Sequence, residues 1–225
     1  MKKDPRMLRL IVANTLKKSW TVTMFIFFNI FIWKELQDFQ LMIGFNFAYA
    51  FIHTIFFLIM CRVLKNGYRW IGLVVSMVFS AAIFGLIAFQ KEFILNNVLF
   101  IWGLLGVVNA IYRVIFNNNN FELTTYYNRW YYAGVRWSIN TIGSLITPML
   151  IWAIISLNIW GYWYETAFLI GALMFLVAGF IWNIPLEYKY HRSYRFFHSV
   201  KKIIAHRDIL IVNIFYMIWA FAFSN

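Results

Sequence analysis

The chain has 225 residues, of which 63% are hydrophobic, 22% aromatic and only 12% charged, and its formal net charge is +12. A soluble fold of this size needs more polar side chains to cover its surface, whereas lipid accepts Phe, Leu, Ile and Trp outside a fold. The composition therefore predicts an all-α polytopic membrane protein and excludes a soluble domain. The single cysteine, Cys61, excludes an intramolecular disulfide and a multi-thiolate metal site.

Residues 1–18 form a basic segment in which no small-residue cleavage site follows the short apolar patch, so we expect a cytoplasmic N-terminus and no cleaved signal peptide. A membrane helix needs about 20 apolar residues. Six such stretches fill residues 19–184, and a partial seventh occupies 209–225. The predicted spans are 19–37, 41–61, 70–89, 94–115, 138–157 and 166–184, with 209–224 as the partial one. The first is the weakest, because its Lys34 must snorkel to the interface.

Basic residues mark one side of the predicted membrane layout. Alternating the loops between the two sides places 18 of the 20 Lys and Arg residues with the N-terminus and leaves Lys34 and Lys91 on the other side. Cytoplasmic loops carry such an excess, so we predict a multi-pass plasma-membrane protein with a cytoplasmic N-terminus. The basic residues cluster at the ends of apolar runs instead of forming one face, which argues against nucleic-acid binding.

A polar island, FNNNNFELTTYYNRWYYAGVR at residues 116–136, separates the fourth and fifth spans. Its four asparagines lack helical periodicity and match no N-x-[ST] motif, so they predict a solvated connector on the cytoplasmic side. The Tyr and Trp residues that follow suit an interfacial belt at the start of the fifth span.

Residues 185–208, PLEYKYHRSYRFFHSVKKIIAHRD, form the longest predicted cytoplasmic loop. Apolar residues recur within it at spacings of four, three and one among Lys and Arg, and they are Phe196, Val200, Ile203 and Ile204. This pattern favours an amphipathic helix on an anionic inner leaflet. A DNA-binding arm is the alternative interpretation.

Two motifs carry a resemblance to known transporters. The loop after the second span, MCRVLKNGYR, matches in kind the pattern G-x-x-x-D-R-x-G-R-R at Lys65, Gly67 and Arg69, with Leu64 in place of its acid. The region of the fifth span carries an acid, an Arg and small residues before a Pro. These residues are Glu122, Arg129, Gly134, Gly143 and Pro148. With six spans and a long basic loop after the sixth, the chain resembles the N-terminal half of the major facilitator superfamily.

The resemblance implies a fold of two six-helix repeats that rock about a central site. The polar island would then be the hinge between the fourth and fifth helices. Within the fifth span, Gly143 and Ser144 permit close approach by a neighbouring helix, and Pro148 removes a backbone hydrogen bond. Both features also occur in membrane helices that have no part in conformational change.

Polar side chains within the spans are candidates for a solute pathway, because an unpaired polar group in hydrocarbon is costly. By the resemblance, the first, second, fourth and fifth helices border the central cavity. The candidates on those helices are Asn29, Asn46, Tyr49, His53, Trp102, Asn109 and Arg113. Hydrogen bonding between helices is an equally good explanation of the same residues.

The function that the sequence predicts is transmembrane transport of an unidentified small molecule by alternating access. The chain would be an incomplete or split transporter that a second polypeptide or a second copy completes. A non-transporting remnant or accessory membrane subunit is the alternative. Paired carboxylates, nucleophile motifs and a metal-ligand pattern are missing from the sequence, so we expect no enzyme activity, metal or cofactor.

Overall fold

The computed structural model describes residues 5–63, 69–125, 127–156, 163–182 and 211. Every secondary-structure element in these residues is an α-helix. The helices are α1 (Pro5–Leu36), α2 (Phe39–Val63), α3 (Arg69–Phe89), α4 (Lys91–Asn96), α5 (Val98–Leu123), α6 (Arg129–Ser156) and α7 (Trp163–Ile181). All seven belong to one compact unit, residues 1–187, and the second unit, residues 188–225, lies almost wholly outside the described part of the chain.

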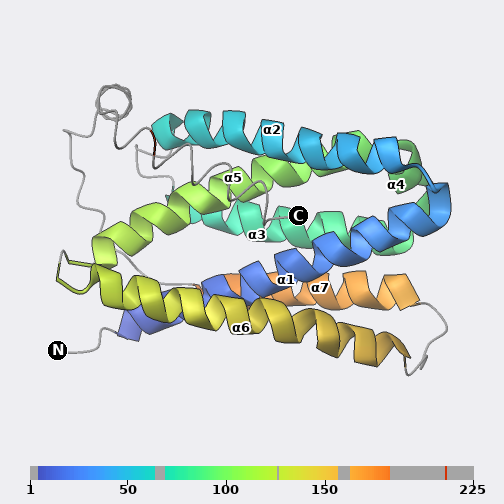
Figure 1. Ribbon diagram of the computed structural model, residues 1–225. Coiled ribbons are helices and arrows are strands. Elements are labelled where there is room, and N and C mark those ends of the chain that lie inside the picture. Colours follow the sequence, from blue (N-terminus) through green and yellow to red (C-terminus); the bar gives the residue numbers. More distant parts are fainter. Residues whose placement is uncertain (1–4, 64–68, 126, 157–162, 183–210, 212–225) are drawn as a thin grey trace. The chain divides into compact units, whose positions relative to one another are not determined.

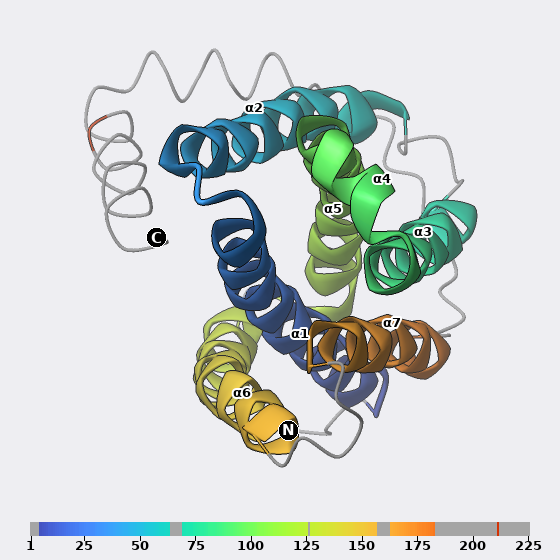
Figure 2. The same ribbon diagram turned by 90° about the vertical axis from the view of Figure 1, so that its right-hand side faces the viewer.

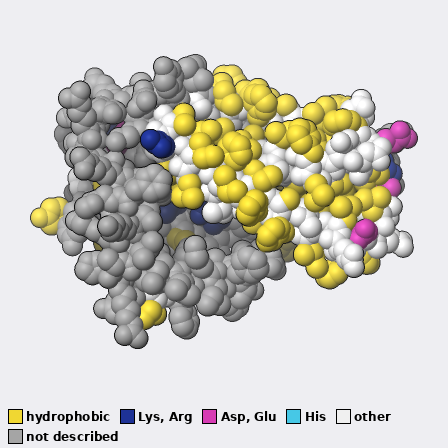
Figure 3. All heavy atoms as spheres, turned by 90° about the horizontal axis from the view of Figure 1, so that it is seen from above, with side chains coloured by type: hydrophobic (Ala, Val, Ile, Leu, Met, Phe, Trp, Pro, Cys, Tyr) yellow, Lys and Arg dark blue, Asp and Glu magenta, His cyan; other side chains and the backbone are white. Residues whose placement is uncertain are grey.

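Consecutive long helices run in opposite directions, and short connections reverse the chain between them (Figure 1). Between α1 and α2, Gln37 takes the left-handed conformation with a φ of 50°, and Asp38 caps α2 by accepting a hydrogen bond from the Leu41 amide at 2.9 Å. At the same end, Glu35 of α1 forms a salt bridge of 2.6 Å with Lys91 of α4. The acidic atoms in Figure 3 gather at this end.

The long helices pack in a pattern that relates the first three to the last three. Helix α1 packs against α6 and α7, while α5 packs against α2 and α3, and α3 and α7 pack against each other. Exchanging α1 with α5, α2 with α6 and α3 with α7 leaves this set of pairs unchanged. Figure 2 shows α1 and α5 between α2 and α6. The packing pairs are therefore symmetric between two groups of three helices, α1–α3 and α5–α7.

An aromatic cluster holds α1 against its neighbours near the Glu35 end of the bundle. The Phe28 ring stacks on Trp102 with centroids 4.0 Å apart, Phe45 meets Trp102 edge-on at 5.2 Å, and Phe168 meets Phe28 edge-on at 6.3 Å. All four side chains are completely buried or nearly so. Because they come from α1, α5, α2 and α7, the cluster fixes the spacing of four helices, and such ring pairs each contribute about 0.5–1.5 kcal/mol beyond their burial.

The outer surfaces of the helices are apolar. Large side chains such as Phe47, Trp152 and Phe180 are 65%, 68% and 84% exposed, and hydrophobic atoms cover much of the described face in Figure 3. Among the described residues, five helical stretches are long and apolar enough to cross a membrane: Phe39–Val63, Gly72–Phe89, Val98–Leu123, Arg129–Ser156 and Tyr164–Ile181. A surface of this kind is matched by lipid, so the fold is that of a multi-pass helical membrane protein.

The number of spans differs from the sequence prediction of six plus a partial seventh. The predicted first span, 19–37, lies within α1, which is not among the five stretches. Its apolar part between Lys18 and Lys34 is shorter than the roughly 20 residues that a membrane helix needs. The predicted partial span at 209–224 and the basic loop at 185–208 fall outside the described residues, apart from Ile211.

The four asparagines at 117–120 are helical, so the prediction of a solvated connector is wrong for them. Helix α5 continues to Leu123, and Asn119 is buried on the same stripe as Tyr112 and Phe116. The spacing of these three residues is helical, and packing against the bundle therefore overrides the weak helix propensity of asparagine. The connector between α5 and α6 is residues 124–128, where the Asn128 side chain accepts a hydrogen bond of 2.8 Å from the Thr125 amide.

Candidate solute-binding face

Helix α1 begins at Pro5 and runs without a break through the segment that the sequence assigns to a separate N-terminal region. Its buried stripe includes Met7, Leu10, Asn14 and Lys17, at helical spacings of three and four. Asn14 and Lys17 are only 6% and 4% exposed. The predicted boundary at residue 18 thus lies inside a helix, and two polar side chains from before it face the interior.

Six side chains from three helices form what we term the inner polar cluster, which comprises Asn14, Thr15 and Lys17 of α1, Asn109 and Tyr112 of α5, and Asn140 of α6. Asn140 Oδ1 accepts hydrogen bonds from Thr15 Oγ1 at 2.8 Å and Asn14 Nδ2 at 3.2 Å. The Tyr112 hydroxyl donates to Asn14 Oδ1 at 2.9 Å. These bonds satisfy buried amides, which would otherwise cost about 1–3 kcal/mol each.

Lys17 is a buried basic side chain at the centre of the cluster. Its ammonium donates a hydrogen bond to Asn109 Oδ1 and lies 3.9 Å from the centroid of the Tyr112 ring. An amide oxygen and an aromatic face both favour a cation, although neither neutralises it. Burial without an opposite charge disfavours the ammonium form, and with the nearby charge of Arg113 it lowers the pKa of Lys17 well below its usual value.

Three further cations surround this cluster. Arg113 follows Tyr112 on α5 and is exposed, Lys18 follows Lys17 on α1 and is exposed, and Arg136 of α6 is half-buried, with Cζ 5.1 Å from the Phe116 ring centroid. The positive charge of Arg113 repels the charged forms of Lys17, Lys18 and Arg136. Within the described part of the chain, no carboxylate is among the charged groups that act on these three.

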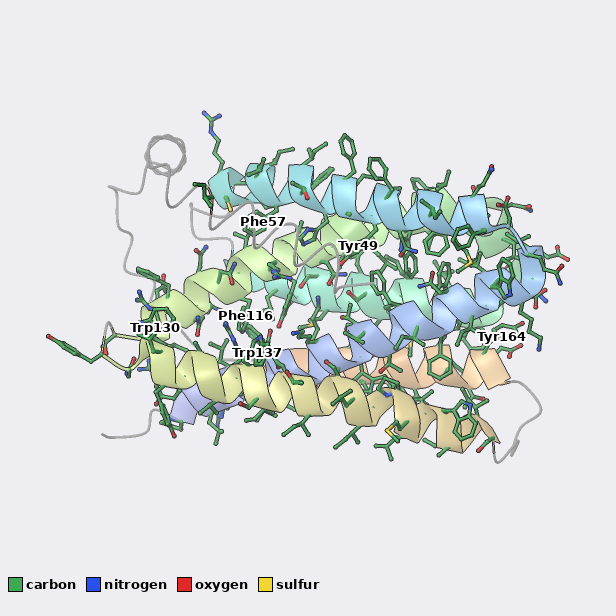
Figure 4. All side chains as sticks on the ribbon, viewed as in Figure 1. Tyr49, Phe57, Phe116, Trp130, Trp137 and Tyr164 are labelled. Atoms are coloured by element: carbon green, nitrogen blue, oxygen red, sulfur yellow. The ribbon has the colours of Figure 1, made fainter. Side chains whose placement is uncertain are left out.

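The polar stripe predicted on α2 lies against the same region. Tyr49 is on the side of α2 that faces α5 (Figure 4), and its side chain interacts with Asn109 of the inner polar cluster. The His53 ring stacks on Tyr49 at 5.8 Å and on Phe57 at 6.3 Å. Arg113 and Lys17 are the cations that act on His53. The structure therefore brings four sequence candidates together, namely Tyr49, His53, Asn109 and Arg113.

Asn29 and Asn46, two further candidates, form a separate pair closer to the Glu35 end of α1. Asn46 Nδ2 donates to Asn29 Oδ1 at 3.2 Å, which links α2 to α1. Each amide also donates to a backbone carbonyl one turn earlier in its own helix, Asn29 to Phe25 and Asn46 to Met42. Hydrogen bonding between helices thus accounts for both residues, while a role in a solute pathway stays a prediction.

Trp102, the remaining pathway candidate, belongs to the aromatic cluster. Its side chain is completely buried between Phe28 and Phe45, and its Nε1 has no hydrogen-bond partner. The indole is therefore packed as part of the core in this structure. Its predicted contact with a solute remains untested.

The residues of the two loop motifs are spread over several places. Lys65 and Gly67 lie outside the described residues, and Arg69 begins α3 with its side chain also outside them. Arg129 begins α6, where its Nε donates to Thr124 Oγ1 at 3.2 Å and its guanidinium lies 4.1 Å from the Phe121 ring centroid. These contacts fasten α6 to the end of α5. Glu122 is an exposed residue of the last turn of α5.

Small residues of α6 lie in two different environments. At Gly143, an added Cβ would overlap Ser19 Oγ and come within 3.1 Å of Thr15 Cγ2, which confirms the predicted close approach of a neighbouring helix, here α1. At Gly134, nothing lies within 4 Å of such a Cβ. Pro148 is inside α6, as the sequence predicts. The roles of these residues in conformational change stay predictions.

Sequence reasoning missed five members of the cluster, namely Asn14, Thr15, Lys17, Tyr112 and Asn140. One signal was present, since the apolar residues Met7, Leu10 and Ile11 continue the helical spacing of α1 backward and place Asn14 and Lys17 on its buried side. Tyr112 and Asn140 carried no comparable signal, because a single polar residue in an apolar helix does not reveal which way it faces.

No family model, curated protein or solved structure matches the chain. Among the described residues, no three His, Cys, Asp or Glu side chains are grouped so that they could hold a metal ion. What the site can do must therefore be inferred from its geometry and charge.

Proposed function

We propose that the chain is the first half of a transporter of the major facilitator type, and that it moves a small solute by alternating access. The observation that carries this proposal is the inner polar cluster, to which α1, α5 and α6 contribute side chains and against which α2 places Tyr49 and His53. These are the four helices expected to border a central cavity. Polar groups are expensive in hydrocarbon, so their concentration there favours a solute site over chance.

The symmetry of the packing pairs between α1–α3 and α5–α7 supports the same proposal. Transporters of this superfamily contain paired three-helix repeats within each six-helix half, and their solute sites lie near the middle of the membrane between the repeats. In this chain, the two equivalent helices α1 and α5 carry Lys17 and Asn109, which bond directly to each other. The site therefore sits where the two three-helix groups meet.

An accessory subunit that transports nothing is the second candidate function. Its support is that Asn14, Asn29, Asn46 and Asn140 all have side-chain hydrogen-bond partners within the bundle. Such bonds stabilise a static helical bundle equally well. The two functions differ in whether the polar face opens to both sides of the membrane.

Cysteine labelling separates these two functions without knowledge of the solute. We expect a His53→Cys variant, in a Cys61→Ser background and in cell membranes, to react with a membrane-impermeant maleimide from either side, because alternating access exposes the face to each side in turn. A Phe47→Cys variant is the matched control, since Phe47 is 65% exposed on the outer side of α2 and faces lipid in the proposed arrangement. Labelling of His53→Cys from one side only would contradict alternating access.

The proposed topology places the N-terminus and the α5–α6 connector in the cytoplasm of a cell whose plasma membrane holds the protein. Tyr127 is 93% exposed in that connector, and Gln40 is exposed in the first turn of α2 at the opposite end of the bundle. We expect Tyr127→Cys to react with the impermeant reagent only after the cells are opened, and Gln40→Cys to react on intact cells. The reverse pattern would place the N-terminus outside.

A further inference from the structure

We propose that the inner polar cluster and the cations beside it form a site for a solute that carries an oxyanion, either a phosphate or a carboxylate group. This inference rests on the proposed transport function in that it names the class of solute, but the site can be tested as a binding site alone. Its basis is a group of four basic side chains from three helices, namely Lys17 and Lys18 of α1, Arg113 of α5 and Arg136 of α6.

A chain of contacts links two of the basic side chains, Lys17 and Arg136. Lys17 lies on the Tyr112 ring, Tyr112 stacks on Phe116 with centroids 6.1 Å apart, and Arg136 lies on the Phe116 ring. Arg113 and Lys18 are the sequence neighbours of Tyr112 and Lys17. The two rings of α5 thus lie between Lys17 of α1 and Arg136 of α6. No carboxylate takes part in this chain of contacts.

The charge balance of this region is what points to an anion. The described acidic residues Glu35, Asp38, Glu92 and Glu165 belong to the other end of the bundle, while Glu122 lies at the last turn of α5. None of these carboxylates acts on Lys17, Lys18 or Arg136. Like charges held close together in a low-dielectric setting repel strongly, so a bound anion would stabilise the arrangement.

The chemistry of the exposed groups indicates which anion fits. Arg113 and Lys18 are exposed and Arg136 is half-buried, so their donors can reach a solute, while Lys17 lies on the buried side, where a bound anion would favour its charged form. A guanidinium binds phosphate or carboxylate through two parallel hydrogen bonds, which suits a planar or tetrahedral oxyanion better than chloride. The Asn109 and Tyr49 side chains supply neutral polar contacts beside the charges.

The test is thermal unfolding of the purified 225-residue chain in a neutral detergent, followed by tryptophan fluorescence. Sodium phosphate and disodium succinate are titrated separately at constant ionic strength, with sodium chloride as the balancing salt. We expect phosphate, succinate or both to raise the midpoint saturably, and chloride to have no such effect. An Arg113→Gln variant should need at least about tenfold more anion for half the effect, since a charge-assisted contact to the anion is lost.

Arg62→Gln is the matched control, because Arg62 is exposed in the last turn of α2 and is not part of the cluster. If Arg113→Gln does not fold, Lys18→Gln serves as the second variant. An equal response of the Arg113 and Arg62 variants, or no saturable response of the unmodified chain, would overturn the inference. So would stabilisation by phosphatidylglycerol alone, which would assign the cations to lipid headgroups. Anion binding without flux in vesicles would instead count against the proposed transport function and leave this site standing.

Discussion

Replacing Gly106 with alanine is expected to destabilise the bundle by about 1–3 kcal/mol, the usual cost of inserting a methyl group where no room exists. An added Cβ at this position of α5 would lie 2.9 Å from the Tyr49 carbonyl oxygen and 3.2 Å from the His53 backbone nitrogen. Both atoms are in the backbone of α2 and cannot rotate away. The two helices would have to separate, and α2 packs chiefly on α5.

The measurement is the midpoint of unfolding in detergent, with two matched glycine-to-alanine controls. At Gly85 of α3, an added Cβ meets nothing within 4 Å, so alanine should leave stability unchanged or raise it by about 0.5–1 kcal/mol through helix propensity. At Gly103, the Cβ would meet only the end of the Ile52 side chain, at 2.7 Å, which can rotate. We expect Gly103→Ala to be the milder of the two α5 variants. Equal midpoints for Gly106→Ala and Gly85→Ala would show that α2 is not held this closely.

The close contact between Gly106 and the backbone of α2 also positions residues of the site. Tyr49 and His53, whose backbones touch Gly106, are the residues that α2 places beside the inner polar cluster. Separation of α2 from α5 would therefore move Tyr49 away from Asn109. If the oxyanion site uses Asn109 and Tyr49 as neutral contacts, Gly106→Ala should weaken anion binding as well as lower stability.

Hydropathy was enough to locate most of the helices, because spans of about 20 apolar residues between polar loops are read from the sequence alone. It failed where tertiary packing overrides local composition. Asn119 looks like part of a polar linker, yet it is buried beside Phe116 in a continuous helix. The start of α1 looks like a solvated basic tail, yet Met7 and Leu10 are completely buried. In both cases the burial of the side chain is decided by the helices that lie next to it, and not by the type of residue.

Part of the candidate site could be predicted from helical spacing, and part could not. Tyr49 and His53 recur at a helical spacing, so the sequence predicts that they share a face, and the structure places both against α5. Lys17 could not be recognised in this way. A lysine near the start of a membrane protein is expected to set topology from the cytoplasm, and only the packing of α1 shows that this one is buried. A buried basic side chain of the proposed anion site is thus one that the sequence pattern assigns to the cytoplasmic N-terminal segment.

The largest functional effect is expected on reconstitution of the 225-residue chain into liposomes. The described helices supply one wall of the proposed site, with His53 and Asn46 half-buried and Arg113 exposed, and a solute site of the alternating-access type needs a second wall. We therefore predict no saturable phosphate or succinate uptake at one copy per vesicle. Exposed polar side chains on that face would otherwise meet lipid at a cost of about 1 to several kcal/mol each, which favours association with a second copy or another polypeptide.

Flux per vesicle is measured against protein density. If two copies form the site, initial uptake should rise with about the square of density where copies are scarce, because mass action then governs the dimer. The Arg113→Gln variant is the control for uptake through the site and should abolish the saturable component at the same density. Uptake that scales linearly down to one copy per vesicle would refute the half-transporter proposal. Uptake that appears only when a second polypeptide is supplied would identify that polypeptide, instead of a second copy, as the other wall.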